Sequence, residues 1–193
     1  MDDYNNIIAL QKAACMYLAL AEDIKQGLST PLPSFQLMPG GVYSDIVPMY
    51  NSNKKRYFIF NHFEANKWYR CAIIACKSES KYAFLVVDTQ GTVIYITHHL
   101  LQRFKQRSFH PCLKVNTMDL LRIFLYNVFE YANNYIGNTC VLGQLGVVRT
   151  VRGDLACYNL EYTGFLTYLS QSQLTKQQQI ALGMLPRYPG TNS

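Results

Sequence analysis

The side chains most often used for catalysis and metal binding are few in this sequence and widely spaced. The histidines are His62, His98, His99 and His110. On an extended segment the adjacent His98 and His99 side chains would diverge, which argues against joint metal ligation. Glu64 and Asp88 have no obvious acid–base partner, and the sequence contains no G-x-S-x-G, Walker, H-E-x-x-H or G-x-G-x-x-G motif. We therefore expect no catalytic residue, no metal site, no cofactor and no enzymatic activity.

The six cysteines show no pairing pattern. They are Cys15, Cys71, Cys76, Cys112, Cys140 and Cys157. None forms a C-x-x-C pair and most have apolar neighbours, so we expect buried free thiols in a reducing compartment. Cys71 and Cys76 are five residues apart on one predicted strand and would point to opposite faces. The start, MDDYNN, is unlike a signal peptide, and no apolar run approaches about 18 residues, so we expect a cytoplasmic protein, less plausibly a nuclear one, without membrane contact.

The composition favours a folded binding protein with a mildly basic surface. Of 193 residues, 49% are hydrophobic and 16% are charged, which is enough apolar material for a sizeable core. The net charge of +6 permits contact with nucleic acid without requiring it. The 15 tyrosines suit half-buried sheet surfaces and binding faces. The candidate nucleic-acid contacts, for which a solvated surface is the alternative interpretation, are Lys54, Lys55, Arg56, Arg103 and Lys105, with Arg107, Arg149 and Arg152 as further basic positions.

Strand signals dominate the first half of the chain. Apolar residues at three- and four-residue steps predict a helix over residues 5–26, ended by Gly27, and residues 28–53 form a long connection with room for one strand. Short polar breaks separate the β-rich runs that follow, which indicates a meander or small barrel. The predicted strands are Tyr57–Phe63, Trp68–Cys76, Tyr82–Asp88 and Val93–Thr97.

The second half alternates helices and strands. HHLLQRF predicts a helical turn, and SFHPCLKV predicts a connector with a short strand. The clearest helix spans residues 118–136, with Thr117 as its N-cap, Asp119 in its first turn and Gly137 at its left-handed C-terminal position. Later elements are strands at Cys140–Val151 and Leu155–Leu160 and a helix over residues 174–184.

The string FEANKWYRCAII…YAFLVVDTQG resembles the Tudor domain. Phe63 stands five residues before Trp68, WYRC differs from the family's WYRA by one residue, and Asp88 falls where the family's Asp closes the third strand. Farther along, the helix at 118–136 and RGDLACYNLEYTGFLTYL are similar to the extended Tudor domain. The matching positions in this last stretch are Gly153, Asp154, Leu160 and Gly164, and the resemblance covers roughly residues 56–170.

The resemblance implies a mainly β fold with helices (α+β). A five-stranded Tudor barrel would be joined by a long helix to an OB-type, staphylococcal-nuclease-like subdomain. The implied division is an N-terminal helix and connector (1–55), the barrel core (56–110), the C-terminal part of the nuclease-like subdomain (111–185) and a loose tail (186–193). One departure is that a helical pattern begins within the first few residues, where the family has strands.

The resemblance also implies a binding pocket that has lost much of its chemistry. Family members that bind symmetrically dimethylated arginine use four aromatic residues and an Asn. The matching positions here are Phe63, Tyr69, Val86, Thr89 and Gly91, so two rings and the amide are missing. Asp88 and Tyr95 complete the residual cage that we expect, Tyr95 requiring a shift in its strand register. Because fewer rings weaken the attraction for a methylated cation, we expect unmethylated arginine to bind instead, stacking on Phe63 or Tyr69 and pairing with Asp88 or Glu64.

By resemblance, the expected function is that of a non-catalytic scaffold or adaptor in piRNA or other small-RNA silencing. Its partners would be Arg-rich N-terminal peptides of Piwi or Argonaute proteins, or other germ-granule components, which makes a perinuclear granule a plausible location. Two alternatives remain open: binding of RNA or another single-stranded nucleic acid through the OB-like part, and a dimerisation scaffold. The sequence does not decide the oligomeric state.

Overall fold

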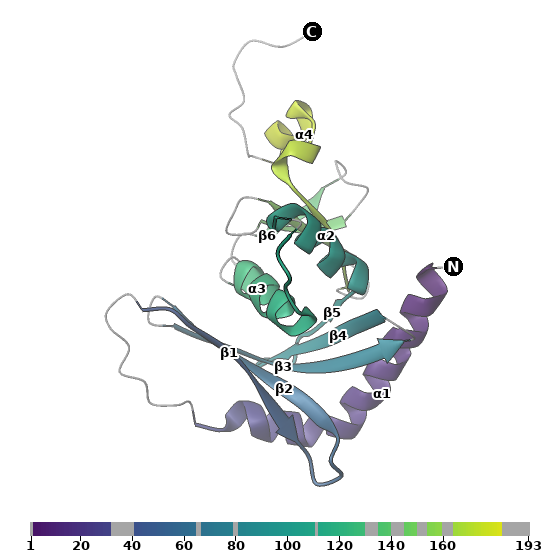
Figure 1. Ribbon diagram of the computed structural model, residues 1–193, viewed down its shortest axis with the longest axis vertical. Helices are drawn as coiled ribbons and strands as arrows, with labels where there is room; N and C mark the ends of the chain where they lie inside the picture. The colour runs from purple at the N-terminus through teal and green to yellow at the C-terminus, as the bar shows by residue number, and fades with distance from the viewer. Residues whose placement is uncertain are drawn as a thin grey trace.

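The computed structural model describes residues 2–31, 41–64, 67–78, 81–110, 112–129, 135–139, 145–149, 154–159 and 164–182 (Figure 1). The helices are α1 (Asp2–Ser29), α2 (His98–Ser108), α3 (Thr117–Phe129), a short 3₁₀ helix (Gln171–Gln173) and α4 (Lys176–Ala181). The strands are β1 (Tyr43–Tyr50), β2 (Arg56–Glu64), β3 (Lys67–Ser78), β4 (Lys81–Asp88), β5 (Val93–Ile96), β6 (Tyr135–Thr139), β7 (Leu145–Arg149), β8 (Leu155–Asn159) and β9 (Gly164–Leu169).

The strands form one continuous sheet in the order β1-β2-β3-β4-β5-β9-β8-β7-β6. Strands β1 to β5 pair antiparallel, β5 pairs parallel with β9, and the remaining strands are again antiparallel. The expectation of a mixed α+β fold with a five-stranded antiparallel sheet is confirmed. Closure into a barrel is not seen, because no pairing among the described strands joins β1 to β5.

Helices cover both faces of the five-stranded part of the sheet. In Figure 1, α1 lies along one face, and α2 and α3 lie on the other. Side chains alternate along each strand, so each strand supplies both cores. The α1 core contains Leu20, Ile24, Ile59, Ile74, Cys76 and Leu85. The α2/α3 core contains Phe60, Cys71, Ile73, Phe84, Phe104 and Phe124. The prediction that Cys71 and Cys76 face opposite sides is therefore confirmed.

Arg70 of the WYRC stretch holds the C-terminal end of α1 against the sheet. Its Nη1 donates to the carbonyl oxygens of Leu28 (2.8 Å) and Thr30 (2.7 Å), and its Nη2 donates to that of Gly27 (3.3 Å). Its Nε donates to Oδ1 of the buried Asn61 at 2.9 Å, which fixes the plane of the guanidinium. The last carbonyls of a helix have no partner within the helix, so one side chain satisfies three backbone groups at once.

Gly27 of α1 packs closely against Tyr57 and Ile59 of β2. A Cβ built on Gly27 would lie 2.9 Å from the hydroxyl oxygen of Tyr57. That hydroxyl donates to the carbonyl of Asp23 at 3.0 Å, so it is not free to move away. Gly27 therefore serves the close approach of helix and strand, whereas the prediction that it ends the helix is wrong, because α1 continues to Ser29.

The start and end of α3 differ from the sequence-based prediction. Asn116, rather than Thr117, is the N-cap, because its Oδ1 accepts a hydrogen bond from the Asp119 amide at 2.9 Å. Within the described residues the helix extends to Phe129, and residues 130–134 of the predicted helix lie outside them. Gly137 lies in β6, not at a helix terminus, since Tyr135 and Ile136 pair with β7. Pairing with a distant strand has overridden the local helical pattern.

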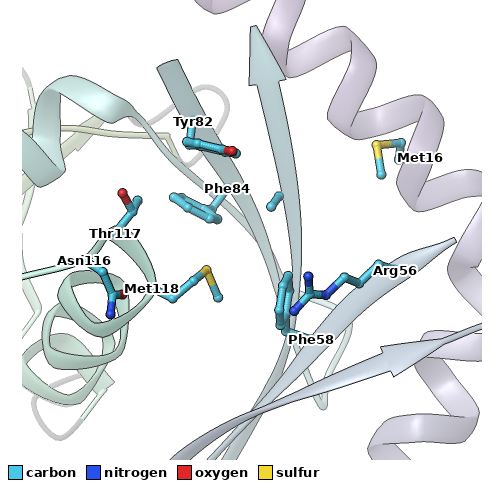
Figure 2. Close-up of a pocket in the computed structure, with 9 residues that line it drawn as sticks. Met16, Arg56, Phe58, Tyr82, Phe84, Asn116, Thr117 and Met118 are labelled. Atoms are coloured by element: carbon cyan, nitrogen blue, oxygen red, sulfur yellow. The ribbon is translucent and has the colours of Figure 1, made fainter. Parts of the chain in front are cut away.

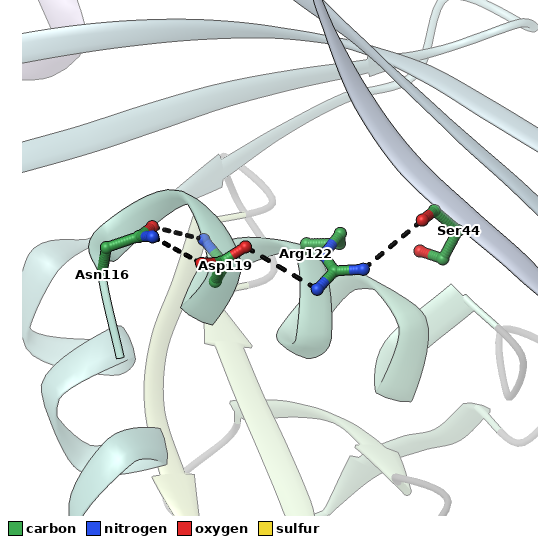
Figure 3. A network of polar contacts seen from close by, with 4 residues as sticks. All are labelled: Ser44, Asn116, Asp119 and Arg122. Atoms are coloured by element: carbon green, nitrogen blue, oxygen red, sulfur yellow. Dashed lines mark hydrogen bonds and ion pairs between the residues drawn. The ribbon is translucent and has the colours of Figure 1, made fainter. Parts of the chain in front are cut away.

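The first turn of α3 is tied to the edge strand β1 by polar contacts. Figure 3 shows Asn116, Asp119, Arg122 and Ser44 in one line of interactions. The Asn116 amide also donates to the Asp119 carboxylate, which lies 3.6 Å from the Arg122 guanidinium. Arg122 in turn donates to the Ser44 carbonyl at 3.4 Å. These contacts fix the distance between α3 and the sheet on that side.

Other local predictions have mixed outcomes. The predicted strands at 57–97 agree with β2 to β5, and the strand allowed within 28–53 is β1. The short strand expected in SFHPCLKV is absent from its described residues, which exclude residue 111. Helix α4 is shorter than the predicted 174–184. Residues 140–144 of the predicted strand Cys140–Val151, and the tail 186–193, lie outside the described residues.

Replacing Arg70 with Lys should destabilise the fold by about 2–3 kcal/mol. A single ammonium cannot reach the same set of carbonyls in the planar arrangement, and hydrogen bonds that involve a charged group contribute about 1.5–3 kcal/mol. Urea unfolding measures the change. The matched variant Arg103→Lys, at an exposed arginine on α2, should stay within about 0.5 kcal/mol of wild type. Equal stability of the two variants would contradict the capping role of Arg70.

Gly27→Ala should cost about 1–3 kcal/mol, because the new methyl group overpacks the Tyr57 hydroxyl. Tyr57→Phe alone should cost about 1 kcal/mol through the lost hydrogen bond to Asp23. The double variant should be more stable than the sum of the two changes predicts, because Phe leaves room for the methyl group. Thermal or urea unfolding of the four proteins gives this coupling, and strict additivity would rule out the contact.

Candidate functional site

The structure places the two retained cage rings on opposite faces of the sheet. Phe63 lies opposite Trp68 in the β2–β3 pairing, and His62 lies opposite Tyr69. Directly paired residues share a face and neighbours alternate, so Phe63 and Tyr69 point in opposite directions. The Phe63 ring packs on Trp68, with centroids 5.0 Å apart. Tyr69 instead stacks on His62 at 5.9 Å.

The other expected cage positions are likewise divided between the two cores. Val86 is fully buried opposite Ile73 in the α2/α3 core. Tyr95 is only 3% exposed and lies in the α1 core, on the other face from Val86. The structure therefore does not bring Phe63, Tyr69, Asp88 and Tyr95 together into one pocket. The physical reason is that successive side chains on a strand point to opposite faces of the sheet. Matching residues to the positions of a sequence motif does not include this alternation.

Asp88 and Gly91 build the tight turn between β4 and β5. The Asp88 Oδ1 accepts hydrogen bonds from the amides of Gln90 and Thr92, each at 2.8 Å. The Gly91 amide donates to the Asp88 carbonyl at 3.2 Å. Gly91 has a φ of +84°, a conformation that side chains disfavour. Gly91 therefore suits the backbone conformation of this turn.

This turn forms one wall of a pocket against α1, which we call the turn pocket. Its volume is about 500 Å³. Tyr17, Glu22 and Lys25 line it from α1, and Asp88 and Thr89 line it from the turn. Asp88 and Tyr17 are half-buried, whereas Glu22 and Lys25 are exposed. Three of the expected cage positions, Asp88, Thr89 and Gly91, therefore do line a pocket, but with residues of α1 rather than with Phe63 and Tyr69.

A second pocket of about 550 Å³, which we call the strand pocket, lies at the other end of β4. Figure 2 shows Tyr82 and Phe84 across the opening from Arg56 and Phe58, with Asn116, Thr117 and Met118 contributed from the start of α3. The Arg56 guanidinium lies over the Phe58 ring, 4.6 Å from its centroid. Sequence analysis identified Arg56 but not Tyr82. The two residues line one pocket because β2 and β4 both pair antiparallel with β3, and the sequence alone does not show these pairings.

The basic candidates fall into two separate groups. Lys54, Lys55 and Arg56 are exposed on the β1–β2 hairpin, beside the strand pocket. Asn51 organises that hairpin, because its Oδ1 accepts from the amides of Asn53 and Lys55 at 3.0 and 2.8 Å. The exposed Arg103 and the half-buried Lys105 lie on α2.

Arg107, also on α2, has a buried Nη1 atom without a hydrogen-bond partner. Burial, with a further contribution from the nearby Arg103, lowers the pKa of its guanidinium. The side chain of Arg149 and all of Arg152 lie outside what the structure describes.

The described thiols and histidines are poorly placed for chemistry. Burial, reinforced by the charge of Asp88, raises the pKa of the Cys71 thiol well above its ordinary value. Burial raises that of Cys157 to about 12, so both thiols stay protonated at neutral pH. The five described cysteines are unpaired, but Cys15 and Cys112 are exposed, contrary to the expectation of buried thiols. Cys140 lies outside the described residues.

His62 is fully buried, and its Nε2 lies 3.4 Å from the Glu64 carboxylate. Its Nδ1 has no hydrogen-bond partner. The described residues contain no group of three His, Cys, Asp or Glu side chains that could hold a metal ion. Within the same residues, no helix has the length and apolar character needed to cross a bilayer.

Comparison with known proteins gives no relative for this chain. No protein-family model matches it, and neither a curated protein nor a solved structure does so.

Proposed function

We propose that the protein is a non-catalytic protein-interaction module that binds an arginine-containing segment of a partner in the turn pocket. One observation supports this proposal: Tyr17, Glu22 and Asp88 all line the turn pocket, the first two from α1 and Asp88 from the β4–β5 turn. A guanidinium is planar, stacks on aromatic rings and pairs with carboxylates through its fork of N–H donors. These are the groups that the pocket offers.

The hydrogen bonds within the turn leave Asp88 able to bind a ligand. Both amides that hold the turn donate to its Oδ1 atom. The Oδ2 atom can therefore accept from a guanidinium without disturbing the turn. Glu22 is exposed on α1, and Lys25 stands on the same wall. Two carboxylates and one ammonium leave a local net charge of −1, which suits a single cationic side chain.

The pocket favours unmethylated arginine. Phe63 and Tyr69 face opposite sides of the sheet, so they cannot enclose a methylated guanidinium together. Methylation keeps the positive charge but blocks bidentate hydrogen bonding, which would weaken the contacts with Glu22 and Asp88. The resemblance to extended Tudor domains supports a scaffold or adaptor role in small-RNA silencing. Arg-rich N-terminal peptides of Piwi or Argonaute proteins are accordingly the first partners to test.

The proposal predicts that Glu22→Gln and Asp88→Asn each weaken binding of an Arg-rich peptide about two- to fivefold, in line with the modest strength of exposed ion pairs. Asn retains a side-chain oxygen for the turn, so Asp88→Asn removes the charge and keeps the backbone. Glu64→Gln is the matched control, since Glu64 lies beside His62 and outside the turn pocket. Calorimetry with unmodified, monomethylated and symmetrically dimethylated versions of one peptide measures both affinity and preference.

Two results would contradict the proposal. A clear preference for the dimethylated peptide, abolished by Phe63→Ala or Tyr69→Ala, would show that a cage forms despite the register of β2 and β3. Equal affinity of wild type, Glu22→Gln and Asp88→Asn would show that the turn pocket does not hold the arginine.

A further inference from the structure

The strand pocket has the features of a site for an anionic ligand with flat rings. We infer that it binds single-stranded nucleic acid, with one base entering between Tyr82 and Arg56 and the flanking phosphates lying over the β1–β2 hairpin. This inference is independent of the proposed peptide binding, because the strand pocket and the turn pocket share no lining residue.

Aromatic faces are available at the mouth of the strand pocket. Tyr82 is 39% exposed, and its ring stacks on Phe84 with centroids 6.4 Å apart. Across the opening, Arg56 lies over Phe58, and its guanidinium is also 5.9 Å from the ring of Tyr50, which is 62% exposed. Bases stack on aromatic rings and on guanidinium planes with little dependence on sequence. The walls therefore supply stacking partners from both sides.

Positive charge surrounds the same opening. Arg56 lines it, and Lys54 and Lys55 precede Arg56 on the exposed hairpin. The Lys77 ammonium lies 5.9 Å from the centroid of the Tyr82 ring. Such cations attract phosphates, and the nucleic acid releases its condensed counterions when they bind. The Asp119 carboxylate lies nearby, in the first turn of α3, but it forms an ion pair with Arg122 at 3.6 Å.

The pocket geometry favours a single strand over a duplex or an acidic peptide. Its volume of about 550 Å³ lies within the range of about 300–1,000 Å³ that is typical of pockets for small organic groups. A base can enter such a pocket only when its faces are free, and pairing in a duplex keeps the bases stacked inside. An acidic peptide would satisfy the lysines but would gain no base stacking on the exposed Tyr82 ring.

Fluorescence anisotropy with a short labelled oligouridine and the full chain tests the inference. Wild type should bind at about 50 mM salt and lose affinity steeply towards about 200 mM. Tyr82→Leu should weaken binding about fivefold or more, whereas Tyr82→Phe, which keeps the ring, should bind like wild type. Lys55→Gln, at an exposed position on the hairpin over which the phosphates lie, should weaken binding and reduce the slope of log K against log salt by about 0.7, the contribution of one phosphate contact on a single strand.

Controls separate the specific site from general charge. Lys176→Gln removes an exposed positive charge on α4, away from the pocket, and should bind like wild type. Thermal unfolding checks that each variant is folded. An unlabelled duplex and polyglutamate should each compete much less well than unlabelled oligouridine.

Three outcomes would overturn the inference. The first is no binding of oligouridine by wild type at about 50 mM salt. The second is wild-type affinity in folded Tyr82→Leu. The third is competition by polyglutamate as strong as that by oligouridine, which would assign the pocket to acidic peptides instead. None of these outcomes bears on the turn pocket, so failure here is distinguishable from failure of peptide binding.

Discussion

The hydrogen bonds of Arg70 to the C-terminal end of α1 are the interaction on which the rest of this structure depends. Without them, two carbonyl groups in the last turn of the 28-residue helix α1, and that of Thr30 just beyond it, would have fewer partners. Unsatisfied polar groups near a core are costly. Burial lowers the pKa of the Arg70 guanidinium, but an arginine remains charged in a protein.

Docking of α1 decides which parts of the sheet can meet a ligand. The helix covers one face, from Leu20 and Ile24 to the buried side chains of β2, β3 and β4. Beyond this core, Tyr17 and Glu22 of α1 face the β4–β5 turn and form the turn pocket. The strand pocket lies at the start of the same strand, at Tyr82. Asp88 lies six positions after Tyr82 on the same strand, which corresponds to about 20 Å. One strand thus places two chemically different pockets far enough apart for two ligands.

The sequence predicts the local elements of this fold well and their spatial relations poorly. Alternating β-branched and aromatic residues locate β2 to β5, and the apolar periodicity locates α1. Tyr135 and Ile136 are mispredicted as helical, because they pair with Val148 and Val147 of β7. Arg70 belongs to a motif that suggests a ligand-binding barrel, yet its partners include Gly27, 43 positions earlier in the chain. No local pattern contains that contact. Similarly, the motif identifies Phe63 and Tyr69 as a pair, and only the β2–β3 register shows that they diverge.

The central claim is that ligands bind at the two ends of β4 and not in a cage of Phe63 and Tyr69. NMR chemical-shift mapping on ¹⁵N-labelled protein tests this most directly, with the Arg-rich peptide and the oligouridine titrated separately. The account predicts that the peptide shifts amides around Tyr17, Glu22 and Asp88. The oligouridine should instead shift amides around Arg56, Tyr82 and Asn116. Shifts from either ligand that converge on Phe63 and Tyr69 together, with both ends of β4 unchanged, would contradict it.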